Sequence, residues 1–517
     1  MGLERSPNHH PWLNNLESLR GSRRAPRLRI IHRGDPMEHQ ERGMRQHPDT
    51  LLQLSREEMK ILGYRVIDQI IDHYASLPGK RVTRIASRSD LEERLREPLP
   101  ELGTDVHQVL HQLQSDVWNN MMHTDHPRFF AFVPSPSNFV SAMADALVAG
   151  LDPFAGTWLE ASGPAQIELV TVDWLRQIIG LPDAADGHFV TGGSAANLTA
   201  LAVARHVKLS GQNEGGAIYF SDQTHSSIER ALKLLGFTPE QICKLPSDGQ
   251  FRLPVEDLEK AILRDRAAGK RPFCVVANAG TTNTGTVDPL PVVAELCTRE
   301  GLWLHVDGAY GAAAVLTATG RSVLAGLELA DSLSIDPHKW LFQPYEIGCV
   351  LVRDARFLRQ TFQVLPEYLE DTRLKDEEVN FCEQGMQLTR SFRALKMWLS
   401  LKVFGVAAFR AAVERGIRMA ELAEHTLRQS SCWEVVSPAQ LGIVAFRFLH
   451  EGASPKKLNT LNQQLVGKTI EDGFAFVSST ILKGCTVLRL CTINPRTADE
   501  DVIATIQRLE QYGHGLV

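Results

Sequence analysis

The spacing of apolar residues changes twice along the 517-residue chain. Residues 56–74 carry apolar side chains at intervals of three and four, which predicts an amphipathic helix with Ser55 as its N-cap. Residues 105–122 predict a second helix, and a segment rich in proline and charge connects the two. We interpret this region as an arm, because two such helices form no core of their own.

Between about residue 164 and residue 354, predicted helices alternate with short apolar strands. Helices are expected at 254–269 and 289–301, and strands at 188–191, 217–221, 273–279, 302–307, 332–336 and 348–352. Strands of this kind, bounded by Gly, Pro or Asp, are typical of a sheet buried on both faces. The alternation predicts a mostly parallel α/β sheet, whose ligands bind at the carboxyl ends of the strands.

The last hundred residues predict a smaller α+β unit. Strands are expected at 442–449, 474–480 and 486–493, with helices near 456–465 and at 498–512. We therefore expect four parts: an N-terminal extension at 1–50, a helical arm at 51–130, a large α/β domain at 131–400 and a small C-terminal domain at 401–517.

Composition narrows the class of protein. The hydrophobic fraction of 43% is ordinary for a globular chain, and the net charge of −6 argues against a nucleic-acid partner. The 8 cysteines show no C-x-x-C pair or zinc spacing, so no metal site is expected and a reducing cytoplasm is the default. No apolar run reaches the roughly 18–20 residues of a membrane span. We expect a soluble cytoplasmic protein without a membrane partner.

The extension is rich in Arg, His, Asn and Pro. An Arg-rich leader fits a transit peptide, but the acidic residues Glu4, Glu17, Asp35 and Glu38 weaken that interpretation. We favour a disordered extension, with translation starting at Met37 or Met44.

Polar residues follow several of the predicted strands. The strand at 188–191 leads into Gly192, Gly193 and Ser194 and then a helix, which is how a chain binds an anion with backbone N–H groups. The spacing is neither a P-loop nor G-x-G-x-x-G, and a tight strand–helix connection capped by Ser194 remains an equal alternative.

Three more such residues are His225, Asp307 and Lys339. A lone His is more often structural, and Lys339 could be a surface charge, although His338, Trp340 and Phe342 surround it in sequence. Together with the glycine turn, however, the three fit pyridoxal 5′-phosphate, which has a phosphate, a basic ring nitrogen and an aldehyde. The aldehyde needs a lysine whose pKa falls from about 10.4 toward neutrality, which burial promotes. The ring nitrogen needs a carboxylate partner.

From about Leu54 to the C-terminus the chain resembles the group II pyridoxal-phosphate-dependent decarboxylases, which share the fold-type I aminotransferase architecture. The motifs that carry the resemblance are H-P-R-F-F-A-F-V-P-S (126–135), D-Q-T-H-S-S-I-E-R-A (222–231), W-L-H-V-D-G-A-Y (303–310), D-P-H-K-W (336–340) and R-S-F-R-A-L-K-M-W (390–398). They are most similar to the aromatic-amino-acid branch. The resemblance implies decarboxylation of an aromatic L-amino acid to its amine through a quinonoid intermediate.

The resemblance also implies a role for each matching residue. Lys339 would be the Schiff-base lysine, Asp307 the partner of the pyridinium nitrogen, and His225 the ring-stacking residue that helps orient the substrate carboxylate. Tyr368, on a mobile loop, would protonate the substrate carbon after carbon dioxide leaves. The remaining cofactor contacts would come from Ser194, Ala195, Ala196, Thr282, Ala309 and His338, and the apolar substrate pocket from Phe129, Pro134 and Trp158 with Thr389.

Two positions depart from the family pattern. Asp336 stands where animal aromatic enzymes have Asn, and an anion near a phosphate is unfavourable unless its side chain points away. Thr389 replaces a small Gly or Ser beside the substrate ring, which narrows the pocket and leaves the substrate open.

The alternatives are a decarboxylase of a non-aromatic amino acid (glutamate, diaminobutyrate or histidine type), an aromatic aldehyde synthase and a non-catalytic homologue. The retained Lys339 and Asp307 argue against the last, and the presence of Tyr368 and His225 argues against the aldehyde synthase. The resemblance further implies a homodimer, in which the N-terminal arm wraps the partner and the Tyr368 loop reaches the neighbouring site.

Overall fold

The structure is a computed structural model that describes residues 52–364, 367–372 and 377–517. The expected extension at 1–50 lies outside the described residues, and the side chains of residues 368–370 do so as well. The chain divides into two units, Met1–Met59 and Lys60–Val517, and the sheets, cores and sites below belong to the second.

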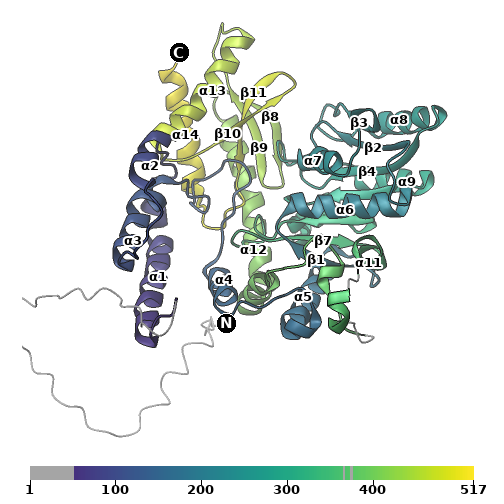
Figure 1. The fold of residues 1–517 in the computed structure, drawn as a ribbon. Coiled ribbons are helices and arrows are strands. Elements are labelled where there is room, and N and C mark those ends of the chain that lie inside the picture. Colours follow the sequence, from purple (N-terminus) through teal and green to yellow (C-terminus); the bar gives the residue numbers. More distant parts are fainter. Residues whose placement is uncertain (1–51, 365–366, 373–376) are drawn as a thin grey trace, which may run out of the picture. The chain divides into compact units, whose positions relative to one another are not determined.

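The described residues form helices and strands in the expected alternation (Figure 1). The helices are α1 (Arg56–Ser76), α2 (Arg88–Leu95), α3 (Val106–Gln112), α4 (Phe139–Leu151), α5 (Trp158–Ile179), α6 (Gly193–Leu209), α7 (Ser227–Leu234), α8 (Val255–Ala267), α9 (Leu290–Glu300), α10 (Ala318–Val323), α11 (Arg356–Phe362), α12 (Ala394–Arg428), α13 (Pro455–Asp472) and α14 (Asp499–Gly515). The strands are β1 (Asp186–Val190), β2 (Gly216–Ser221), β3 (Ile242–Leu245), β4 (Arg271–Asn278), β5 (Trp303–Asp307), β6 (Ser332–Ile335), β7 (Gly348–Val352), β8 (Trp433–Gln440), β9 (Ile443–Phe448), β10 (Ser478–Leu482) and β11 (Cys485–Cys491).

The larger sheet has the strand order β1-β7-β6-β5-β4-β2-β3. The pairs from β6 to β3 are parallel, whereas β7 runs antiparallel to both of its neighbours. The prediction of a mostly parallel α/β sheet is confirmed. Because β7 runs opposite to β6 and β1, the carboxyl ends of β1, β2, β4, β5 and β6 all lie at one edge.

The antiparallel strand β7 explains the position of Lys339. β6 leaves the sheet at Ile335, and β7 re-enters it from the same edge at Gly348. The connection therefore has to stay at the edge where the parallel strands end. Trp340 within it is fully buried and stacks on Tyr310, with ring centroids 5.2 Å apart and an angle of 2° between the planes. This packing fixes the loop that carries Lys339.

Apolar residues cover both faces of the sheet, as the near-continuous apolar strands predict. On β5, Leu304 and Val306 belong to one core, and Trp303 belongs to the other. The second core is closed by α6, which lies along the sheet and contributes Ala196 and Leu201 among others (Figure 1).

The C-terminal region forms a separate four-stranded antiparallel sheet of order β10-β11-β9-β8. A third core, with Phe446, Leu488 and Leu490 at its centre, joins this sheet to α12, α13 and α14. The expected α+β unit is thus present, with β8 as a strand that the sequence pattern did not reveal.

Two other element predictions need correction. The helix expected at 105–122 is α-helical only over Val106–Gln112, after which Leu113–Val117 forms a π-helical turn and Trp118–Asn120 a 3₁₀ turn. The strand β3 was missed because its four residues, I-C-K-L, are too few to show a period. In the part of the chain that is described, no helix is both long and apolar enough to cross a membrane.

Candidate active site

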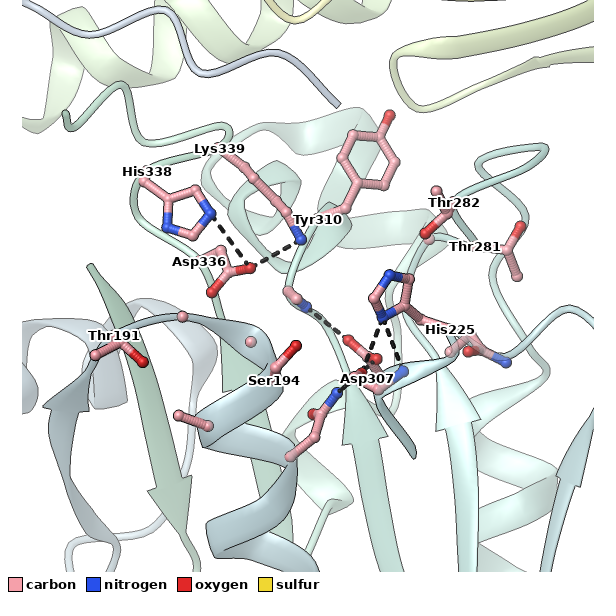
Figure 2. Close-up of a pocket in the computed structure, with 18 of the residues that line it drawn as sticks. Thr191, Ser194, His225, Thr281, Thr282, Asp307, Tyr310, Asp336, His338 and Lys339 are labelled. Carbon is pink, nitrogen blue, oxygen red and sulfur yellow. Dashed lines mark hydrogen bonds and ion pairs between the residues drawn. The ribbon is translucent and has the colours of Figure 1, made fainter. Parts of the chain in front are cut away.

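A cavity of about 400 Å³ lies at the edge of the large sheet where the parallel strands end (Figure 2). It gathers predicted residues from segments far apart in the sequence, as expected for a doubly covered sheet. Those that line it are Ser194, Ala195, His225, Thr282, Asp307, Ala309, His338 and Lys339.

The turn between β1 and α6 provides donors for an anion. Gly192 and Gly193 line the cavity, and α6 begins at Gly193, so its positive end faces the cavity. The N–H groups of Ala195 and Ala196 already donate to the carbonyl oxygen of Gly192, which leaves those of Gly193 and Ser194 as the candidate donors. A Cβ on Gly193 would lie 2.8 Å from Asp336 Oδ2, so the turn requires glycine there.

Asp307 is a buried carboxylate held by three donors. Asn197 Nδ2 donates to Oδ2 at 3.0 Å, while Ser334 Oγ and the Ala309 N–H donate to Oδ1 at 3.2 and 3.1 Å. These bonds offset part of the cost of burying the charge and fix the direction of the side chain. Asp307 thus presents a fixed anion to the cavity.

His225 is a neutral ring at the same cavity. The backbone N–H of Ser227 points at His225 Nδ1 from 3.3 Å, and since that N–H can only donate, Nδ1 is an acceptor and the proton sits on Nε2. Burial lowers the pKa of His225. A neutral imidazole suits stacking on a flat ring.

Lys339 reaches the cavity with its ammonium group paired to a carboxylate (Figure 2). Its Nζ lies 2.8 Å from Asp336 Oδ2. Burial opposes the charge, but Asp336 and, less strongly, Asp307 outweigh it, so the pKa of Lys339 is raised above its usual value. Burial does lower this pKa, as expected, but the prediction that the pKa falls overall is wrong, because the sequence did not reveal that Asp336 faces the amine.

Several residues predicted for the site lie away from this cavity. Ala196 is fully buried in the core under α6, and the four residues predicted for substrate binding are not among the described residues that line the cavity. Phe129 packs in a small core with Phe476, Pro134 is buried, Trp158 begins α5 and Thr389 is exposed. The backbone of Tyr368 belongs to the 3₁₀ segment Glu367–Thr372, and its side chain lies outside the described residues.

Sequence reasoning missed Asn197, which links two of the predicted residues. Its Nδ2 donates both to Asp307 and to Ser227 Oγ, the hydroxyl that also contacts His225 Nδ1, and its Oδ1 lies 3.0 Å from His305 Nε2. A signal was present: Asn197 lies one helical turn after Gly193, and His305 lies two residues before Asp307, on the same face of β5. A buried amide opposite two polar strand positions has to bond to them.

The residues fit pyridoxal 5′-phosphate in three respects and raise one difficulty. The glycine turn, the fixed Asp307 carboxylate and the Lys339 amine match a phosphate, a basic ring nitrogen and an aldehyde. The difficulty is Asp336, whose buried Oδ1 has no hydrogen-bond partner among the described residues and whose carboxylate lies against the glycine turn rather than pointing away.

Comparison with known proteins agrees with this fit. Residues 89–449 match the family model described as the pyridoxal-dependent decarboxylase conserved domain. An aromatic-L-amino-acid decarboxylase of Bacillus atrophaeus is 50% identical over 461 residues, covering 89% of this chain and 96% of that protein. A phenylacetaldehyde synthase of Arabidopsis thaliana is 30% identical, with 88% and 95% covered.

A solved structure supports the same assignment. The crystal structure of Oryza sativa TDC with PLP and tryptamine superposes with a TM-score of 0.86 at 28% identity, and the match covers 90% of this chain and all of that one. The expected fold-type I architecture is thereby confirmed. Because the family model spans more than two thirds of the sequence and the cavity holds the groups that its cofactor requires, the chain belongs to the pyridoxal-phosphate-dependent decarboxylase family.

Proposed function

We propose that the protein decarboxylates an aromatic L-amino acid to the corresponding amine. The observation that carries this proposal is the convergence of Lys339, Asp307, His225 and the Gly192–Ser194 turn on one cavity. The 50% identity to an aromatic-L-amino-acid decarboxylase supports the aromatic substrate. Among the described residues of the cavity, Glu346 already pairs with Arg393 at 3.0 Å, so it is not a free anion for a cationic substrate.

Each residue then has a distinct task. The Gly193 and Ser194 N–H groups and the Ser194 hydroxyl would hold the phosphate, and His338 would lie close to it. Ala195 and Thr282 would line the cofactor, as Ala196 does in the family pattern. Lys339 would hold the aldehyde carbon covalently, and Asp307 would keep a proton on the ring nitrogen. The bound cofactor supplies an electron sink for the pair of electrons left when carbon dioxide departs.

The protein's own groups would control which bond breaks. His225 would lie over one face of the cofactor ring and Ala309 over the other. The neutral imidazole of His225 would help hold the substrate carboxylate out of the plane of the cofactor ring. Tyr368 would return a proton to the substrate carbon once carbon dioxide has gone. The substrate side chain would be bound by Phe129, Pro134, Trp158 and Thr389. These residues lie outside the cavity that a single chain forms.

We also propose that the active unit is a homodimer in the cytoplasm, with the four-part domain division predicted above. The α1 residues Ile61, Tyr64 and Ile71 are 54%, 68% and 45% exposed, and a second cavity of about 780 Å³ lined by Val66, Ile70, Leu110 and Leu113 lies beside them. Such an apolar surface fits a second copy of the chain. All eight cysteines are free thiols, which suits a reducing compartment.

A product screen tests the proposal. The purified protein with added cofactor should be offered each of the twenty amino acids together with dopa, 5-hydroxytryptophan and diaminobutyrate, and the amine and carbon dioxide should be measured. We expect turnover of one or more aromatic substrates and negligible turnover of glutamate, diaminobutyrate and histidine. Exclusive formation of a non-aromatic amine would overturn the substrate class.

The identity to a phenylacetaldehyde synthase favours an aldehyde synthase as the second candidate. This activity would consume dioxygen and water and yield aldehyde, carbon dioxide, ammonia and hydrogen peroxide in place of the amine. We expect the wild type to form amine and Tyr368→Phe to divert product toward aldehyde. Peroxide formed by the wild type in amounts matching the aldehyde would support the second candidate instead.

A further inference from the structure

Asp336 places a buried carboxylate at the turn where a phosphate should bind. A Cβ on Gly193 would lie 2.8 Å from its Oδ2, and a Cβ on Gly348 would lie 2.9 Å from its Oδ1. The residue is 3% exposed. The glycines on two sides thus enclose the carboxylate, and little room remains for it to turn away.

Lys339 is the cation that neutralises Asp336 in this arrangement. The other titratable groups facing the carboxylate are His338 and Tyr345 on the same loop, His225 before α7 and Cys349 on β7. Burial lowers the pKa of both histidines and raises those of Tyr345 and Cys349, so all four are neutral near pH 7. Among the described residues that face Asp336, Lys339 is therefore the one cation that neutralises its carboxylate.

His338 has an acceptor turned toward the same carboxylate. Its Nδ1 lies 2.7 Å from the carbonyl oxygen of Ile347, and since a carbonyl only accepts, the ring proton of neutral His338 sits on Nδ1. The lone pair of Nε2 then faces Asp336 Oδ2 from 3.6 Å. Two acceptors oppose each other across this gap, which is longer than a hydrogen bond, and one added proton would turn their repulsion into an attraction that can close it.

Cofactor binding would disturb this balance twice. Condensation of the aldehyde with the Lys339 ammonium group would form a carbon–nitrogen double bond in place of the carbonyl bond and release one water molecule and one proton, so this nitrogen would no longer pair with Asp336 as an ammonium ion. The phosphate would bring nearly two negative charges to the same turn. Two anions in a buried site, with their cation withdrawn, repel each other strongly.

We propose that the pair Asp336–His338 takes up one proton from solvent when the cofactor binds, and that this proton, held between Oδ2 and Nε2, allows a carboxylate to share the phosphate turn. Asp336 is in this sense a positioning residue that links cofactor affinity to pH. The inference rests on the proposed cofactor site. Because the proton is bound in the complex, affinity is highest at low pH and falls as pH rises.

Calorimetry of the apoenzyme measures the proton directly. Pyridoxal 5′-phosphate should be titrated at pH 8 into wild type and into Asp336→Asn, in two buffers of different ionisation enthalpy. Protons that belong to the cofactor are common to both proteins and cancel in the difference. The charge of Lys339 depends on Asp336, so it should be measured separately in each apoenzyme, from the pH dependence of the reaction of Lys339 with cyanate, and subtracted. We expect the wild type to take up about one proton more than the variant. Between pH 7 and 9 its Kd should rise about tenfold per pH unit relative to the variant.

Matched variants separate the outcomes. Asp183→Asn removes a carboxylate whose side chain is 100% exposed, and it should behave as wild type. Asp336→Ser is a second uncharged variant in case Asp336→Asn folds poorly, and it should show the same loss of proton uptake. Equal proton counts in wild type and both Asp336 variants would refute this inference alone. Failure of wild type to bind the cofactor at all would instead refute the proposed function.

Discussion

Asp307 illustrates how one side chain is prepared for its task. Its two oxygens accept from Asn197, Ser334 and the Ala309 N–H, so the carboxylate is oriented and part of the cost of burying it is offset. A nearly isosteric amide in its place would keep the shape of the site while removing the charge that holds a proton on the cofactor's ring nitrogen.

Asp307→Asn should therefore still bind pyridoxal 5′-phosphate but lose most of its activity. We expect kcat to fall about a hundredfold or more, the scale seen when one preorganised electrostatic group is removed. Steady-state amine formation and the visible absorbance of the bound cofactor report the two properties separately. A variant with near-normal kcat would show that Asp307 does not act on the ring nitrogen.

At the scale of secondary-structure elements, the start of α6 is a position that neighbouring atoms enclose tightly. Gly193 lies at its first position, and a Cβ there would lie 2.8 Å from Asp336 Oδ2 and 3.0 Å from Ala309 Cβ. The strand β1, the helix α6 and the β6–β7 loop meet at this point, so no one of them can move without the others.

Gly193→Ala should weaken cofactor binding while leaving the fold intact. We expect at least about a tenfold increase in Kd, since the methyl group would push Asp336 or the turn out of place. Gly467→Ala is the matched control, because a Cβ at this position in α13 meets nothing within 4 Å. It should stabilise the protein by about 0.5–1 kcal/mol without changing cofactor affinity. Equal cofactor affinity in the two variants would show that the turn does not bind the phosphate.

Sequence patterns predicted the large sheet and the edge at which its polar residues meet, because apolar strands and strand-terminal residues are local signals. They missed β3 and overextended α3, since a four-residue strand and a π-helical turn depend on neighbouring elements. The pairing of Asp336 with Lys339 was also missed. It depends on Gly192, Gly193 and Gly348 closing around one carboxylate, and no periodicity encodes such a contact.

At the scale of the whole molecule, the single chain forms a cavity suited to the cofactor. None of the residues predicted to bind the substrate is among the described residues that line this cavity. The exposed apolar side chains of α1 suggest how this is resolved, because a partner chain could cover them and complete the substrate pocket. The assembly is thus part of the functional proposal.

Ile61→Asp combined with Tyr64→Asp should shift the protein toward monomer and abolish most of its activity. Sedimentation velocity and amine formation measured on the same samples would show both effects, with Asp68→Asn on the same helix as control. A fully active monomer would contradict the dimer proposal.

Mixed chains test whether the loop of Tyr368 crosses between subunits. Inactive Lys339→Ala chains and Tyr368→Phe chains should recover about a quarter of wild-type amine formation when refolded together, since half of the dimers would then have one complete site. Absence of recovery would place Tyr368 in the site of its own chain.

The central claim is that Lys339 carries the cofactor, and reductive trapping tests it most directly. The protein should be incubated with pyridoxal 5′-phosphate, reduced with borohydride, digested and mapped by mass spectrometry, with Lys339→Ala in parallel. We expect a pyridoxyl label on the peptide that contains Lys339 and no specific label in the variant. Labelling of another lysine, or equal labelling of the variant, would contradict the assignment of this cavity as the active site.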